Sequence, residues 1–236
     1  MSTETDAKEQ AVRDLKQAAA NAAAEQIQDG AIVGLGSGST ASLAVDAIGK
    51  RVAQGLHITG IPTSEKTAEQ AKRLGIPLST LAEYRKVDVT VDGADEVELG
   101  TLNLIKGGGG NLLREKIVAS ASERLVIVVD ETKLVKKLGS RGPVAVEVAP
   151  FGWQSTEDRI RKLGCNSKLR IDSNGSTFIT DGGHYILDCE FGPIASSADL
   201  STELDGVVGI MEHGLFLQLT SQVFVGGAKG VQVINP

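Results

Sequence analysis

The chain has 236 residues and a formal net charge of −6, and 41% of its residues are hydrophobic. This composition is typical of a globular protein, and the lack of basic runs argues against nucleic-acid binding as its main function. Two cysteines without a CxxC or a His/Cys cluster argue against a disulfide framework or a zinc site. Because the N-terminus is polar and no apolar run is long enough to span a membrane, we expect a cytoplasmic protein that binds no membrane.

Short apolar strands and helices alternate in the first half of the chain. An alanine-rich helix is expected over residues 8–28 and ends at Asp29-Gly30. The strands expected after it are short and rich in β-branched residues, and they cover residues 31–36, 57–61, 86–92, 102–106 and 124–130. Helices are expected over residues 41–54, 67–75 and 112–123. The alternation predicts an α/β fold with a mostly parallel, Rossmann-like sheet and helices on both faces.

The pattern changes near Pro143. A strand at 143–149 and a helix at 153–164 precede an expected hairpin, in which residues 165–172 pair with residues 176–182. A strand-like segment from His184, a helix at 197–206 and a strand at 207–213 follow. This β-α-β-β-α-β order predicts a smaller α+β ferredoxin-like domain, inserted as residues 143–211 into an α/β domain of residues 1–142 and 212–236. The tail after residue 214 is expected to return to the α/β domain as edge strands.

Polar side chains follow several of the expected strands at the point where each strand ends. They are Ser37 to Thr40, Thr63, Ser64, Lys66, Asp92, Asp95, Lys106 and Lys133. Ligands of parallel α/β sheets bind at the carboxyl ends of the strands, so this shared edge is the expected site.

The segment GLGSGST, residues 34–40, puts glycines and small hydroxyls ahead of a helix. Such a turn offers N–H donors and a positive helix end to a phosphate, but it equally fits a plain turn with Ser39 or Thr40 as N-cap. The segment matches neither GxGxxG nor a Walker loop, and no acidic residue ends the next strand to hold a ribose. A dinucleotide cofactor is therefore disfavoured.

The segment VDGADEVE, residues 91–98, carries four acidic residues. Glu96 and Glu98 are expected in a solvated turn, whereas Asp92 ends an apolar strand and is expected to be buried. With Asp95 it could hold sugar hydroxyls, move protons, or bind a hard cation such as Mg²⁺.

The segment IKGGGGNLLREK, residues 105–116, places four glycines between Lys106 and a helix with Glu115 in its first turns. Four glycines suggest a close approach of bare backbone to a ligand. Glu115 is either a surface residue favoured by the helix dipole or a carboxylate aimed at the ligand, able to act as a base. Lys106 and Lys133 are ligand contacts or surface lysines, and Lys136 and Lys137 are expected at the surface.

Four segments, IVGLGSGSTA, VDGADEV, IKGGGGNLLREKI and VVDETKLV, occur in this order and spacing. They resemble ribose-5-phosphate isomerase of the A type, and the similarity extends to PVAVEVAPFGW and GVVGIMEHGLF, so it covers most of the chain. Ser37 stands where the family often has threonine, which keeps the hydroxyl.

The resemblance implies an aldose–ketose isomerase of the pentose phosphate pathway that interconverts D-ribose 5-phosphate and D-ribulose 5-phosphate without a cofactor. It implies that Glu115 shuttles a proton between C2 and C1 through an enediolate, that Asp92 assists ring opening, and that Lys106 faces the developing oxyanion. It further implies a homodimer or homotetramer. The implied substrate-binding residues are Ser37, Gly38, Ser39, Thr40, Asp92, Gly93, Ala94, Asp95, Lys106, Gly107, Gly108, Gly109 and Lys133.

Two other classes of protein share features with this sequence. A sugar-phosphate sensor without catalysis would share the α/β core but would have no need for Glu115 beside Lys106. A nucleotide-dependent oxidoreductase or transferase is disfavoured because its glycine fingerprints are missing.

Overall fold

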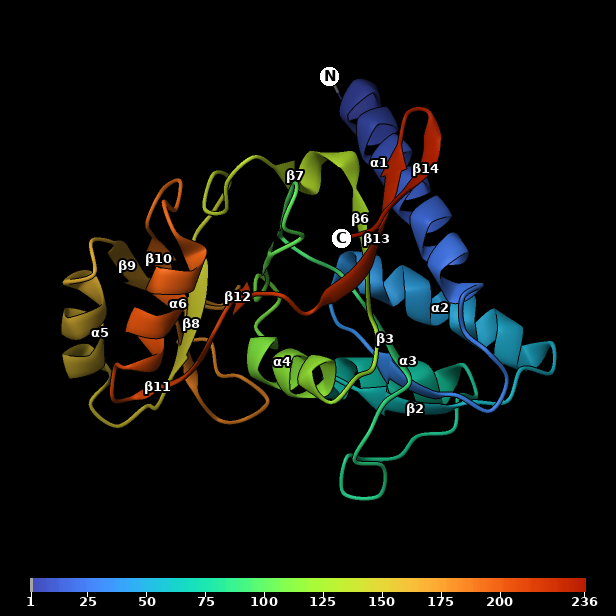
Figure 1. Cartoon of the computed structure of the whole chain (residues 1–236), viewed down its shortest axis with the longest axis horizontal. Helices are drawn as coiled ribbons and strands as arrows, with labels where there is room; N and C mark the ends of the chain where they lie inside the picture. Colours follow the sequence, from blue (N-terminus) through green and yellow to red (C-terminus); the bar gives the residue numbers. More distant parts are fainter. Residues whose placement is uncertain (1) are drawn as a thin grey trace. The chain divides into compact units, whose positions relative to one another are not determined.

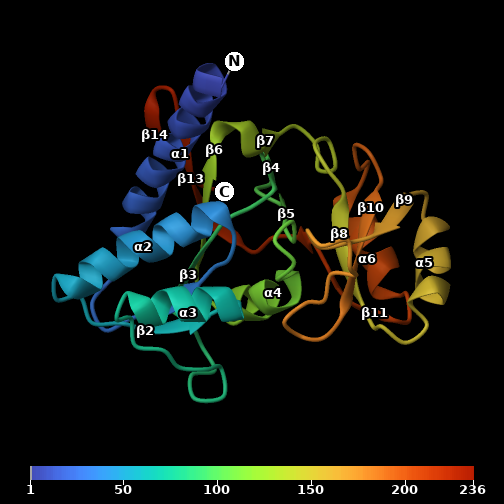
Figure 2. The same cartoon turned by 180° about the vertical axis from the view of Figure 1, so that it is seen from behind.

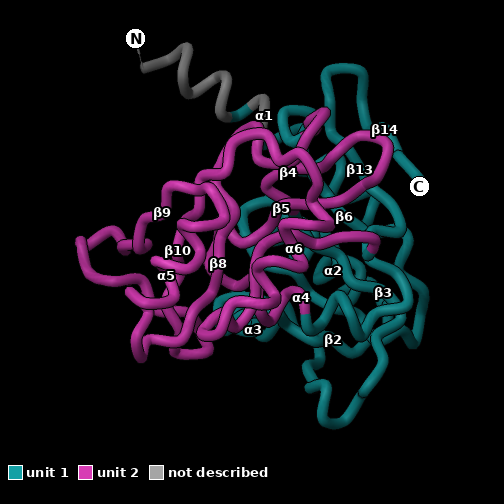
Figure 3. The backbone as a smooth tube through the Cα atoms, turned by 60° about the vertical axis from the view of Figure 1, so that its left-hand side comes forward, with its two compact units in different colours: residues 1–93, 117–133, 219–236 teal, residues 94–116, 134–218 magenta. Residues whose placement is uncertain are grey.

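The computed structural model describes residues 2–236, with the side chains of residue 10 and of residues 13–236. Contacts divide the chain into two compact units (Figure 3). Unit 1 comprises Met1–Gly93, Ile117–Lys133 and Leu219–Pro236, and unit 2 comprises Ala94–Lys116 and Leu134–Gln218. These bounds differ from those of the two domains expected from the sequence, because residues 94–116, 134–142 and 212–218 belong to unit 2.

Unit 1 is built on a six-stranded sheet (Figure 1). In spatial order its strands are β14 (Gly230–Ile234), β13 (Thr220–Gly227), β6 (Leu125–Asp130), β3 (Val89–Asp92), β1 (Ile32–Leu35) and β2 (Thr59–Pro62). All neighbouring strands pair in parallel except β13 and β14. The mostly parallel sheet is confirmed. Because β13 is buried between β6 and β14, only β14 is the edge strand expected of the tail.

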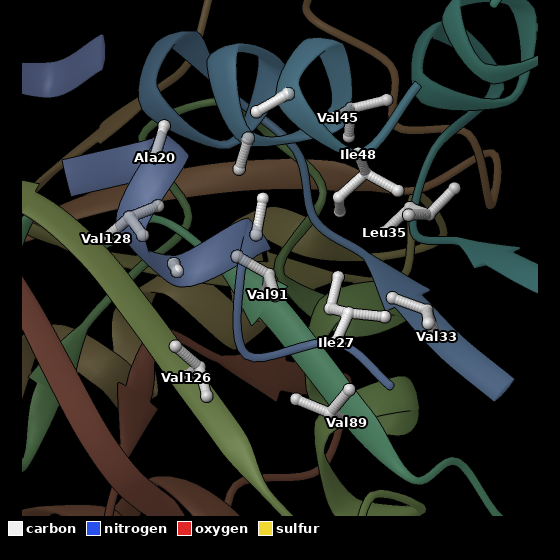
Figure 4. Packing of buried hydrophobic residues seen from close by; sticks show 14 of the residues in the cluster. Ala20, Ile27, Val33, Leu35, Val45, Ile48, Val89, Val91, Val126 and Val128 are labelled. Carbon is white, nitrogen blue, oxygen red and sulfur yellow. The ribbon is translucent and has the colours of Figure 1, made fainter. Parts of the chain in front are cut away.

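Helices cover both faces of this sheet, as predicted. Helices α1 (Ser2–Ala24) and α2 (Ser39–Ala53) pack on one face, where Val33, Leu35 and Val91 meet the alanines of α1 (Figure 4). Strand residues alternate between faces, so Thr90 and Gly34 point the other way. There Val118 of α4 (Leu112–Ser120) packs against Ile61 and Val87. A Cβ at Gly34 would lie 1.8 Å from Thr90 Oγ1, which explains this glycine.

A four-stranded antiparallel sheet forms the core of unit 2. Its strand order is β11 (Ile210–His213), β8 (Val144–Val148), β10 (Tyr185–Glu190) and β9 (Asn166–Leu169). Helices α5 (Trp153–Arg161) and α6 (Ser197–Asp205) complete the ferredoxin-like unit (Figure 2). The expected hairpin is wrong: β9 pairs with β10, and only the bridge between Ile171 and Thr177 joins the two segments we had paired. The reason is that Ile186, Leu187 and Cys189 are buried, whereas Ile171 and Ile179 are exposed.

A second small sheet of unit 2 carries the glycine segment. It joins β12 (Leu215–Phe216), β5 (Leu104–Ile105), β4 (Glu96–Glu98) and β7 (Leu134–Val135) in that order. Lys106 follows β5 directly, and its backbone N–H donates to Gly214 O. The remaining elements are α3 (Glu65–Arg73) and a short 3-10 turn, η1 (Glu131–Lys133), both in unit 1. Within the described residues, none of the helices combines the length and apolar character that a membrane crossing requires.

Candidate active site

In unit 1, three of the expected site segments lie at one edge of the parallel sheet. Leu35 pairs with Pro62 on one side and with Val91 on the other, so the residues that follow β1, β2 and β3 leave the sheet at the same level. Ser37, Thr63 and Asp92 therefore come together from segments far apart in the sequence.

The hydroxyl of Ser37 lies at the centre of a buried network. Its Oγ is 2.7 Å from Thr63 Oγ1, 2.8 Å from Ser64 Oγ and 3.1 Å from Thr67 Oγ1. Thr67 Oγ1 also donates to Gly36 O, and Ser64 caps α3 by accepting from Thr67 N. These four hydroxyls fix the turn after β1 without any formal charge.

The alternative of a side-chain N-cap at Ser39 or Thr40 is wrong. The N-cap of α2 is Gly38, which has φ 97° and no side-chain cap. Gly38 and Ser39 are exposed and Thr40 is buried in the first turn of α2. A residue with a side chain would be strained at this φ, so the glycine is required by the backbone.

Asp92, at the end of β3, is buried as expected and is 1% exposed. Its Oδ1 accepts from Ser37 N at 3.1 Å and from Gly93 N at 2.7 Å. A Cβ on Gly36 would lie 2.2 Å from the same oxygen, so the GLG segment lets this carboxylate approach the backbone. These two backbone N–H groups hold the orientation of the carboxylate.

In unit 2, Lys106 and Glu115 form a buried ion pair. Lys106 Nζ lies 3.3 Å from Glu115 Oε2, and the two side chains are 3% and 6% exposed. The surface alternatives for both residues are therefore wrong. Removing a charge from water costs on the order of several kcal/mol for each buried ion. A pair of charges kept in the interior at this cost indicates a functional site rather than a contribution to stability.

Phe216 completes the surroundings of Lys106. Its fully buried ring has Lys106 Nζ at 5.5 Å and Lys116 Nζ at 5.0 Å from its centroid. Lys116 in turn donates to Glu212 Oε1 and to His213 O. Burial lowers the pKa of Lys116, and its bond to Glu212 opposes that shift. Phe216 ends the segment GVVGIMEHGLF, but no site role was predicted for it, because its contact with Lys106 depends on the pairing of β12 with β5.

The four glycines have different structural reasons. Gly107 and Gly110 have φ of 103° and 80°. A Cβ would meet Leu112 and Ala145 at Gly107, Asp95 at Gly108 and Phe178 at Gly110, all under 3.0 Å. Packing within the chain is thus a reason for three of these glycines that is independent of any ligand contact.

At Gly109, by contrast, the nearest atom to an added Cβ is Asn111 Nδ2 at 3.9 Å. Its neighbour Gly108 donates its N–H to Asp95 Oδ2 at 2.8 Å. Gly109 is therefore the glycine whose open backbone best fits the expected approach of a ligand.

Two further acidic residues differ from expectation or were missed. Glu96 is buried rather than solvated, because its carboxylate accepts from Gly139 N at 2.7 Å and Arg141 N at 2.6 Å. Asp130, at the end of β6, lies 3.7 Å from Lys16 Nζ.

Lys133 is half-buried in η1, and Lys136 and Lys137 are exposed as expected.

Among the residues with described side chains, the one cluster with metal-like spacing is Asp205, Glu212 and His213. Its groups already bond to protein partners, since Glu212 accepts from Lys116 and His213 Nε2 lies 3.1 Å from Asp205 Oδ1. Burial and the nearby charge of Lys116 lower the pKa of His213, which favours a neutral ring. The cluster is therefore a hydrogen-bonded structural feature of unit 2. None of its three residues is among the predicted site residues.

Comparison with known proteins bears on the whole chain. The family described as ribose 5-phosphate isomerase A (phosphoriboisomerase A) matches residues 59–230. A relative named ribose-5-phosphate isomerase A from Gloeobacter violaceus is 58% identical over 94% of this chain and 96% of its own length. A relative of the same name from a Synechococcus strain is 52% identical over 94% and 97%.

Solved structures agree. Ribose 5-phosphate isomerase A from Methanocaldococcus jannaschii superposes with a TM-score of 0.90 at 40% identity, covering 94% of this chain and 99% of that one. A D-ribose-5-phosphate isomerase in complex with phospho-erythronic acid has a TM-score of 0.92 at 35% identity, with 95% and 99% covered. The sensor interpretation has no such support. The chain belongs to the ribose 5-phosphate isomerase A family, and it is an isomerase.

Proposed function

We propose that this isomerase interconverts D-ribose 5-phosphate and D-ribulose 5-phosphate by moving one proton between C2 and C1 of the opened sugar. The observation that carries the proposal is the buried pair of Lys106 and Glu115 in the segment KGGGGNLLRE. The relative solved with phospho-erythronic acid supports the choice of substrate, because a sugar acid phosphate presents a carboxylate where an enediolate would form.

The proposed reaction needs a base and a means of stabilising negative oxygen. Glu115 removes the proton from C2, the hydroxyl proton of O2 passes to O1 in the enediolate, and Glu115 returns the carbon-bound proton at C1. During this transfer, negative charge develops on the oxygens of C1 and C2, and Lys106 offsets it. A preorganised cation in a buried position is more effective than one in water, because little solvent screens its field.

The remaining roles follow the family resemblance. Asp92 assists ring opening, and its two backbone N–H partners keep its carboxylate in place. We assign substrate binding to the residues named from the sequence, with the turn at Ser37 to Thr40 and Lys133 binding the phosphate. The open backbone at Gly109 and the hydroxyl network beneath Ser37 support this assignment.

Glu115→Gln tests the proposal directly. The variant keeps the shape of the side chain but removes the base, so turnover of ribose 5-phosphate should fall by about 10²–10⁴-fold. In D2O, the wild-type enzyme should exchange substrate hydrogen with solvent, and the variant should not. Calorimetry with phospho-erythronic acid should still detect binding.

Glu123→Gln is the matched control, since Glu123 is an exposed glutamate just after α4. It should leave turnover and exchange unchanged. Near-normal turnover in Glu115→Gln would show that another group is the base.

The wider context is also a proposal. We place the reaction in the pentose phosphate pathway, in the cytoplasm, without a cofactor, and in a homodimer or homotetramer. Support comes from the family, and from Cys165 and Cys189, which are buried free thiols as in proteins of reducing compartments. Light scattering of the purified chain would give the oligomeric state.

A further inference from the structure

Arg170, the residue after β9, reaches the glycine segment of its own unit. Its Nη1 donates to Gly107 O at 2.8 Å and to Gly108 O at 3.2 Å. Two consecutive carbonyl groups are thus held toward one guanidinium. We infer that Arg170 is a positioning residue for the isomerase reaction, which turns the peptide group between Gly108 and Gly109 so that its N–H donates to the reacting oxygen of the substrate.

The geometry of the peptide group carries the first step. The described chain contains no cis peptide bond, and in a trans peptide the N–H points opposite to the C=O. Because Arg170 holds the carbonyls of Gly107 and Gly108, the N–H groups of Gly108 and Gly109 point away from it. The first of these is used internally, since Gly108 N donates to Asp95 Oδ2. Of the two N–H groups, we therefore expect that of Gly109 to donate to a ligand.

The guanidinium also changes the strength of this donor. A cation that binds a carbonyl oxygen polarises the whole peptide group and makes its N–H a better donor. Arg170 thus contributes to stabilising an anion that it does not touch. The effect matters most when charge develops on the substrate oxygen, which is the step at which Lys106 also acts in the proposed function.

The position of Arg170 is itself fixed. Its Nε donates to Asp188 Oδ2 at 2.9 Å, and its Nη2 forms a second, close bond to Asp188 Oδ1. Its guanidinium carbon lies 5.9 Å from the centre of the Phe178 ring, and Phe178 packs against Gly110. Because the carboxylate and the aromatic ring already hold the guanidinium group, it loses little conformational entropy when it binds the two carbonyl groups.

The inference rests on the proposed function and is tested with Arg170→Ala and Arg170→Lys. In Arg170→Ala, kcat should fall at least tenfold, by analogy with the loss of about 10²–10³ when an oxyanion donor is removed, whereas KM should change little. Guanidinium ion, added at concentrations too low to unfold the protein, should restore part of kcat. Arg170→Lys keeps the charge but has no fork, so its kcat should be intermediate.

Arg161→Ala is the matched control. Arg161 forms a comparable fork in the same unit, donating to Ser167 and Glu157 without touching the glycine segment. It should keep kcat and show no response to guanidinium. If Arg170→Ala does not fold, Arg170→Lys and Asp188→Asn carry the test through kcat alone.

Two results would overturn the inference: unchanged kcat in the folded Arg170 variants, or a loss in kcat that guanidinium does not relieve in folded Arg170→Ala. Glu115→Gln separates this failure from a failure of the proposed function. If Glu115→Gln is inactive while the Arg170 variants are normal, only the role of Arg170 is wrong.

Discussion

The two parts of the predicted site are built on different physical principles. In unit 1, the hydroxyl groups around Ser37 bond to one another, and the backbone N–H groups of Ser37 and Gly93 donate to Asp92. In unit 2, a lysine and a glutamate are buried together 3.3 Å apart. Neutral networks hold a turn in one geometry, whereas buried charges respond to a change of charge nearby. In the proposed function the turn at Ser37 binds the phosphate and the Lys106–Glu115 pair carries the proton transfer, and four further predictions follow from this difference.

Lys106→Met should have the largest effect. It removes the cation from the proposed reaction and leaves Glu115 buried without this partner, so kcat should fall about 10²–10³-fold. The free energy of unfolding should fall by about 3–5 kcal/mol, as when one member of a buried pair is removed. Steady-state kinetics and urea unfolding measure the two losses.

Lys168→Met is its control, because Lys168 forms an exposed pair with Glu190 and its side chain is 79% exposed. It should change neither quantity appreciably. Should Lys106→Met retain wild-type kcat, the proposed role of Lys106 in the proton transfer would be wrong.

Gly36→Ala should come next, and it acts on unit 1. The added Cβ would lie 2.2 Å from Asp92 Oδ1 and 2.6 Å from Asp92 Cα, so the strand ends must separate. Overpacking of this kind costs about 1–3 kcal/mol. Thermal unfolding should show the loss, and kcat should fall because Asp92 moves. Gly142→Ala has open space around its Cβ and should behave as the wild type.

Ser37→Ala should have a smaller effect. It removes the hydroxyl that joins Thr63, Ser64 and Thr67, and a lost hydrogen bond in a buried network costs about 1–3 kcal/mol. Ser37→Thr keeps the hydroxyl and should be milder. We expect KM to rise more than kcat falls, measured with ribose 5-phosphate. A fall in kcat at constant KM would contradict the binding role of the Ser37 turn.

The smallest effect concerns pH and unit 2. The lowered pKa of His213 means that protonation favours the unfolded chain, whose histidine pKa is about 6.5. Its contribution to stability is therefore complete above that pH and is lost as pH falls below it, at no more than about 1.4 kcal/mol per pH unit. Lys116, Asp205 and Glu212 are the charged groups that face it.

Urea unfolding between neutral and mildly acidic pH should show this loss in the wild type and a flatter profile in His213→Gln. His57→Gln is the control, since the side chain of His57 is 84% exposed. Identical profiles for the wild type and His213→Gln would mean that the histidine does not change its charge on unfolding.

Features whose residues lie close together in the sequence could be predicted from it. The β-branched runs gave the parallel sheet, and the residues of the Lys106–Glu115 pair lie in one short segment. The partners that support them could not be predicted, because Arg170 and Phe216 reach the glycine segment only through strand pairing over large separations in the chain. Glu96 was misjudged because its two backbone partners lie more than 40 residues away.

The position of β13 has a consequence for how the protein is made. β13 pairs with β6 inside the sheet of unit 1, and Gly226 brings it so near α1 that a Cβ there would lie 2.0 Å from Leu15 O. The ribosome therefore delivers every residue of unit 2 before it delivers β13. A nascent chain that stops at residue 218 contains all the strands of unit 2. In the same chain α1 is already synthesised, but β13, one of the strands against which it packs, is still missing. Because β13 and β14 are synthesised last, unit 1 should be the later of the two to complete its folding.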